Sequence, residues 1–189
     1  MRNLKFTMLI FFIVAFSCDK EDNNYIFQHR KSFDSLKLDE VILFEKEKGS
    51  KERFYNNTFG LGEDYYPNKF KYKLANPRVF ERKDKDLYLE SDYFYTAKDS
   101  SIKVVFYAWG KNRISQDTLY AKSPHYKILL EKYNSLKNQL TNKLGKSFKP
   151  QLEPGCYLSL DSYCQWKSSN MNAYLAMHTN EIRLVIYSK

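Results

Sequence analysis

Apolar residues recur at helical spacing between residues 124 and 144, and this pattern constrains the fold more than any other feature of the chain. The recurring residues stand three or four apart and form one stripe: Leu129, Tyr133, Leu136, Leu140 and Leu144. Pro124 suits the first helical position, where its missing N–H costs nothing, and Ser123 can cap the helix before it. Gly145 suits the left-handed residue that follows a helix. The pattern therefore predicts a helix over 124–144 whose stripe enters a hydrophobic core or, as the alternative, binds a partner.

The residues before this helix contain runs with the alternation of β-strands. Residues 70–74 and 87–96 alternate with period two, and 97–101 suit a hairpin loop. The run 102–109 then places four apolar residues on one face: Ile102, Val104, Phe106 and Ala108. The earlier segment 38–48 fits a helix or a strand equally well.

The last residues of the chain predict an antiparallel hairpin with one buried face. With Asn180 and Glu181 as a two-residue loop, the facing pairs are Met177 with Leu184, Leu175 with Ile186, Tyr174 with Tyr187, and His178 with Arg183. Strands, one long helix and further strands indicate an α+β fold, a mostly antiparallel sheet with one long helix packed on one face. We expect a single domain over 33–189.

The net charge of +9 comes mainly from lysine, since the chain has 24 lysines and seven arginines. Recognition of phosphates and bases favours arginine, and the basic residues would have to cluster. Here acids interrupt them, as in 45–48 and 81–86, which is typical of a solvated face. The sequence therefore predicts no nucleic-acid partner.

The first residues have the organisation of a secretory signal. A basic start without acids precedes an apolar run of eleven residues, 6–16, and six polar residues follow at 19–24. The run is too short to cross a bilayer, which needs about 20 residues, so we expect a signal peptide over 1–17. A buried N-terminal strand or helix is the alternative.

The residues Ala15, Phe16, Ser17 and Cys18 resemble the lipobox of bacterial lipoproteins, and the phenylalanine-rich signal is similar to those of Bacteroidota. The resemblance implies cleavage between Ser17 and Cys18, a diacylglyceryl group on the Cys18 sulfur, and acylation of the new amine by a fatty acid such as palmitate. This chemistry needs a cysteine because the thiolate is the nucleophile. Residues 18–32 would then be the lipidated cysteine and a polar tether.

Two resemblances after the lipobox bear on the membrane that is reached. Lys20, Glu21 and Asp22 resemble the signal that exports Bacteroidota lipoproteins to the outer leaflet of the outer membrane. Asp19 instead resembles the inner-membrane retention signal of enterobacteria. We expect the surface location, because the signal as a whole is similar to those of Bacteroidota.

The chain carries no familiar catalytic or metal-binding motif. It has no Gly-x-Ser-x-Gly, His-Glu-x-x-His, Cys-x-x-Cys or EF-hand pattern, and 60–62 lacks the remainder of a phosphate-binding loop. We therefore expect no cofactor and no metal. As an enzymatic alternative, Glu63 with Asp64, or Asp84 with Asp86, offers a carboxylate pair for glycoside hydrolysis.

Aromatic residues make up 17% of the chain and suggest a platform that stacks on sugar rings. Its candidate members are Tyr65, Tyr66, Tyr93, Tyr95, Trp109 and Trp166. The alternative is that these rings simply fill strands, where aromatic residues are favoured.

Cys156 and Cys164 form a candidate disulfide, because an exported chain folds in an oxidising compartment. A tight turn near Leu160 and Asp161 would bring them opposite each other, at the Cα separation of about 4.4–6.8 Å that a bond needs. One straight strand would hold them about 26 Å apart, and two unrelated buried thiols are the third possibility.

Together these features predict a non-enzymatic, lipid-anchored protein of the cell envelope, displayed at the outer-membrane surface, with a binding or structural domain. Its partners would be the membrane, through the lipid, and an envelope protein or a glycan. The alternatives are a glycan-binding accessory lipoprotein and a periplasmic inhibitor or immunity-type lipoprotein.

Overall fold

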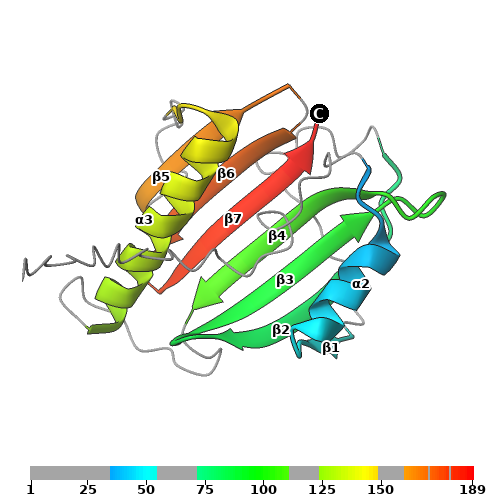
Figure 1. The fold of residues 1–189 in the computed structure, drawn as a ribbon, viewed down its shortest axis with the longest axis horizontal. Coiled ribbons are helices and arrows are strands. Elements are labelled where there is room, and N and C mark those ends of the chain that lie inside the picture. Colours follow the sequence, from blue (N-terminus) through cyan, green and yellow to red (C-terminus); the bar gives the residue numbers. More distant parts are fainter. Residues whose placement is uncertain (1–34, 55–71, 111–123, 149–159, 170, 179) are drawn as a thin grey trace, which may run out of the picture.

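The computed structural model of the chain describes residues 35–54, 72–110, 124–148, 160–169, 171–178 and 180–189. Within them, seven strands form one antiparallel sheet in the order β1-β2-β3-β4-β7-β6-β5, and two helices accompany it (Figure 1). In chain order the elements are α2 (Leu38–Glu47), β1 (Lys51–Arg53), β2 (Arg78–Asp84), β3 (Leu87–Tyr95), β4 (Ile102–Gly110), α3 (Pro124–Leu144), β5 (Leu160–Lys167), β6 (Met171–His178) and β7 (Glu181–Ser188). The fold is α+β with an antiparallel sheet, as the sequence predicts.

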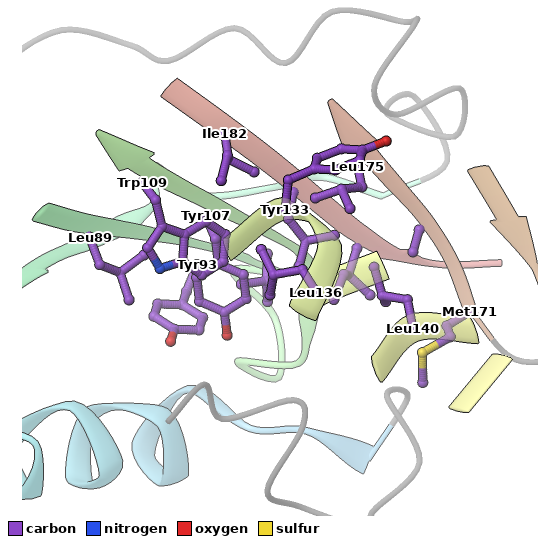
Figure 2. Packing of buried hydrophobic residues seen from close by; sticks show 14 of the residues in the cluster. Leu89, Tyr93, Tyr107, Trp109, Tyr133, Leu136, Leu140, Met171, Leu175 and Ile182 are labelled. Atoms are coloured by element: carbon purple, nitrogen blue, oxygen red, sulfur yellow. The ribbon is translucent and has the colours of Figure 1, made fainter. Parts of the chain in front are cut away.

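The long helix α3 has the bounds that the leucine spacing predicts. Four of the five stripe residues are buried, Leu129, Tyr133, Leu136 and Leu140, and Leu144 is partly buried against the same core. They share one core cluster with sheet residues such as Leu175 and Ile182, as Figure 2 shows. Gly145 follows the helix with a φ of 89°, a left-handed conformation that suits glycine, and its N–H donates to the Thr141 carbonyl at 2.9 Å. The core interpretation of the stripe is confirmed.

The segment that fits a helix or a strand equally well is the helix α2. Its first turn carries Asp39 and Glu40 and its last turn carries Lys46, the order of charges that complements a helix dipole. Its buried residues Val41 and Phe44 belong to the same core cluster as the α3 stripe. In the view of Figure 1 both helices lie in front of the sheet.

The two faces of the sheet carry different clusters. One face supplies the sheet residues of the main core, including Val105, Tyr107 and Trp109 on β4. The other face carries a smaller cluster of buried residues: Phe94, Val104, Tyr174, Ala176 and Val185. The alternation of side chains along each strand separates these two sets.

The β3–β4 hairpin confirms two predicted strands and the predicted loop at 97–101 between them. Of the alternating segment 70–74, the structure describes Leu74 in an isolated bridge to Thr96.

One face assignment on β4 is wrong. Val104, Phe106 and Ala108 alternate along one face, but Ile102 belongs to the main core on the other face. The register with β3 shifts between 94 and 95, where one extra residue on β4 reverses the alternation.

The C-terminal hairpin exists, with a register two residues from the predicted one. Leu175 faces Leu184, where we expected Ile186. The predicted loop of Asn180 and Glu181 is wrong, because Glu181 already begins β7. A shift of two residues leaves every side chain on its expected face, because side chains alternate with period two.

The charged runs are not solvated along their whole length. Strand β2 is rich in charged residues and the sequence pattern misses it, yet the Arg82 side chain is 8% exposed and that of Asp84 is 13% exposed. Glu45, in the other run, is fully buried. Each of these side chains enters an ion pair, which offsets the cost of removing a charge from water.

Candidate binding site

A pocket of about 260 Å³ lies where the turn between β2 and β3 meets the first half of α3. Its lining combines charged and apolar side chains: Asp84, Lys85, Asp86, Leu87, Ile128, Glu131, Lys132 and Ser135. Charged side chains from distant parts of the sequence converge around this hollow.

Both walls of the pocket follow from local structure. Asp84 pairs with Leu87, so Lys85 and Asp86 form a two-residue turn, and Lys85 has a positive φ of 57°. The residues from α3 are spaced by three, one and three positions along the chain, which places them on one side of a helix. The tight turn therefore presents its charges toward that side of α3.

The most buried charges of the pocket are Asp84 and Lys132, whose side chains are 13% and 12% exposed. Lys132 Nζ donates to Asp84 Oδ2 at 2.8 Å, and Trp109 Nε1 donates to the same oxygen at 2.9 Å. Lys132 Nζ also lies 5.0 Å from the centroid of the Trp109 ring, within cation–π range. These contacts tie β2, β4 and α3 together.

The surroundings keep Asp84 ionised. Burial alone would raise the pKa of Asp84, but the Lys132 ammonium and the hydrogen bonds from Lys132 and Trp109 outweigh it, and the pKa is lowered. A general acid for glycoside hydrolysis needs the opposite, a carboxyl with a raised pKa. Asp84 therefore does not fit the role of the general acid in glycoside hydrolysis.

Nothing in the sequence marks Asp84 and Lys132 as partners. They stand 48 residues apart, and Asp84 lies in a run whose alternating charges are typical of a solvated face. Only the pairing of β2 with β3 and the packing of α3 bring the two side chains together.

A second buried charge lies between α2 and the sheet. The carboxylate of Glu45 accepts hydrogen bonds from the Tyr93 hydroxyl at 2.5 Å and from Ser50 and Arg82. Burial, with Tyr107 and Glu45 nearby, raises the pKa of Tyr93, so its hydroxyl remains a proton donor. These contacts connect α2 to β2 and β3, and we assign the cluster a structural role.

Asp92 on β3 is a buried carboxyl on the face of the smaller cluster. It is 6% exposed, it stands between Val79 and Phe106 on the adjacent strands, and its Oδ1 has no hydrogen-bond partner among the described residues. Desolvation raises the pKa of Asp92 to about 7. Its charged form is therefore a cost to the fold above that pH.

The rings proposed as a sugar platform lie mostly in the core. Tyr93, Trp109 and Trp166 are 0% exposed, so their assignment to an exposed platform is wrong. They occupy strand positions that face the main core, and Figure 2 shows Tyr93 and Trp109 among its side chains. Tyr95 is half-buried.

Cys164 on β5 is buried and forms no disulfide with a described residue, and its Sγ lies 3.5 Å from the Tyr133 hydroxyl, which donates to it. The turn expected near 160–161 is wrong, because Leu160 begins β5. Cys156 lies outside the described residues, so a bond between the two cysteines stays a prediction.

Several predicted site residues lie outside the described part of the chain: Ser17, Cys18, Tyr65, Tyr66 and Cys156. Within the described residues, no group of three or more His, Cys, Asp or Glu side chains is placed to hold a metal ion. In the same part of the chain, no helix has the length and apolar character of a membrane span. No known protein family, curated protein or solved structure matches the chain.

Proposed function

We propose that the chain is a lipid-anchored protein of the bacterial cell envelope, displayed at the outer-membrane surface, whose domain binds another envelope component without catalysis. The anchor is supported by the lipobox-like residues 15–18 and the export-like residues 20–22. The binding role is supported by the pocket between the β2–β3 turn and α3.

The observation that carries the binding role is the arrangement of charges in this pocket. Asp84 is neutralised by Lys132 and held by Trp109, so the pair gives the pocket a fixed shape. Lys85, Asp86 and Glu131 also line it and are exposed, so both signs of charge are offered to a ligand. Complementary charges of this kind give specificity to protein–protein contacts, which makes a protein partner the best fit.

The arrangement of the helices on the sheet is consistent with a binding role for this pocket. We infer that α2 and α3 form a layer on one face, because both bury side chains in the main core cluster. The glycan-binding alternative now depends on Tyr65, Tyr66 and the half-buried Tyr95, since the other candidate rings are buried.

Radiolabelled palmitate tests the anchor. Wild-type protein should be labelled in cells and the Cys18→Ala variant should not, because the thiolate is the acceptor. Equal labelling of both would refute the lipoprotein proposal. Protease treatment of whole cells should digest the domain, and a protected domain would place it on the periplasmic side.

A photo-cross-linking residue tests the pocket. Placed at Glu131, it should give a discrete adduct with a partner in cells, whereas Asn138, exposed on the same helix, is the matched control. Adducts of the same identity and yield from both positions would argue against a partner at the pocket.

A further inference from the structure

The chain enters the described fold at one end of the sheet. The Ile102 N–H donates to the Leu36 carbonyl at 2.9 Å, and Lys37 forms a bridge with Ser101. The helix α2 therefore begins beside the loop that joins β3 to β4, at the upper right in Figure 1. Any tether that precedes residue 35 approaches the domain from this end.

The same end of the sheet carries a concentration of lysines, which we call the lysine end: Lys37, Lys73, Lys98, Lys103, Lys146 and Lys167. Strand register places those on β4 and β5 at the same level of the sheet, with β7 and β6 between them. The successive pairs across the sheet are Val104 with Tyr187, Tyr187 with Asn172, and Asn172 with Lys167. Lys73 joins them because its carbonyl accepts from the Ala97 N–H, and Lys146 because Phe148 pairs with Gln165 on β5.

These lysines outnumber the acids around them among the described residues. The acids at this end include Asp39, Glu40, Asp99 and Glu52, of which Asp99 is paired with Lys37 at 3.3 Å and Glu52 with Arg78. Lys73, Lys98, Lys146 and Lys167 are exposed, and Lys103 lies over the Tyr72 ring at 4.8 Å. The lysine end therefore has a positive surface.

Among the described residues, the charges at the opposite end of the sheet are balanced. Lys83, Asp84, Lys85 and Asp86 alternate at the β2–β3 turn, and Arg183 pairs with Glu181 at the start of β7. The pocket with Asp84 and Lys132 lies at this balanced end.

We propose that the lysine end docks on the anionic headgroups of the membrane in which the lipid is inserted. This inference rests on the proposed lipid anchor. The sixteen residues between Cys18 and Ser35 span at most about 60 Å, so the lipid tethers the end where α2 begins within that distance of the bilayer and the lysines can reach its surface. Each lysine close to an anionic surface is attracted by about 1 kcal/mol, and the attraction fades within a Debye length of about 10 Å.

The docking gives the domain a defined orientation. The lysine end and the pocket lie at opposite ends of the same strands. When the lysine end docks on the membrane, the pocket therefore points away from it. The pocket then faces the medium, where a partner reaches it.

Lysine reactivity tests this orientation on the lipidated wild-type chain. The protein is inserted into vesicles of phosphatidylcholine, with or without phosphatidylglycerol, and treated with a water-soluble acylating reagent. Mass spectrometry should show Lys98 and Lys167 reacting about fivefold more slowly on the anionic vesicles, the factor that 1 kcal/mol corresponds to. The exposed lysines Lys83 and Lys127, near the balanced end, are the matched controls and should react equally on both.

Raised salt should abolish the protection, because it screens the attraction. The double variant Lys98→Gln, Lys167→Gln should lose the protection of Lys73, and the control variant Lys83→Gln, Lys127→Gln should keep it. Equal protection of both lysine sets, or of neither, on anionic vesicles would overturn the docking alone. Release of the protein from neutral vesicles would overturn the anchor, and this inference with it.

Discussion

The carboxylate of Glu45 on α2 is paired with the guanidinium of Arg82 on β2, and the two side chains are 0% and 8% exposed. A buried ion pair adds little stability over apolar residues of the same size, but loss of one partner leaves an uncompensated charge in the core. The Tyr93 hydroxyl and Ser50 satisfy the remaining acceptor positions of Glu45. The pair therefore specifies where α2 sits on the sheet.

Replacement of Arg82 alone should be costly. Arg82→Met should lower the free energy of unfolding by about 3–5 kcal/mol, and the double variant Glu45→Gln, Arg82→Met should recover much of the loss. Lys37→Met is the control, since Lys37 and its partner Asp99 are 42% and 54% exposed, and the change should cost less than about 1 kcal/mol. Denaturant unfolding measures all three variants. Equal decreases in the free energy of unfolding for the two single variants would show that burial of the Glu45–Arg82 pair does not make its loss more costly.

The α3 stripe should show the energetics of core packing. Leu136→Ala should destabilise the domain by about 2–5 kcal/mol, because the side chain is 0% exposed and its loss leaves a cavity. Asn138→Ala, exposed on the same helix, should change the stability by less than about 0.5 kcal/mol. An unchanged denaturation midpoint for Leu136→Ala would contradict the core assignment.

Asp92 should make the stability depend on pH near neutrality. Its pKa is about 7 in the fold against 3.8 ordinarily, so the folded state favours the protonated carboxyl. The stability associated with that proton is complete below pH 3.8 and is lost as the pH rises through 7, by at most about 4 kcal/mol. Asp92→Asn should therefore be more stable than wild type at alkaline pH and similar to it at the acidic limit. Thermal unfolding across this range checks it, and a difference that is constant with pH would exclude titration of Asp92 as the cause.

The cysteine pair remains open to a direct measurement. In the mature protein, denatured and then alkylated without reduction, we expect no alkylation at Cys156 and Cys164, whereas a merely buried thiol would react. The bond would close only a small loop, so its reduction should lower the free energy of unfolding by no more than about 2–4 kcal/mol. Cys164→Ser is the control, because it must leave Cys156 reactive. Two alkylated thiols in the wild-type chain would rule the bond out.

Local signals account for the parts of the fold that the sequence predicts well. The bounds of α3 follow from the apolar spacing together with Pro124 and Gly145, all of them properties of neighbouring residues. The faces of the C-terminal hairpin also follow from alternation, whereas its register does not, because a shift by two leaves the faces unchanged. The face of Ile102 depends on a register shift against β3, which one strand alone does not reveal.

The candidate site, in contrast, could not be predicted from local signals in the sequence. By itself the sequence determined that the chain carries a lipobox-like start, a long amphipathic helix and alternating strands. Only the tertiary structure decided that Asp84 meets Lys132 and Trp109, that Glu45 meets Arg82, and that the lysines gather at one end of the sheet. The reason is physical: the spacing of apolar residues is read within one element, whereas the environment of a charge depends on which distant element packs against it.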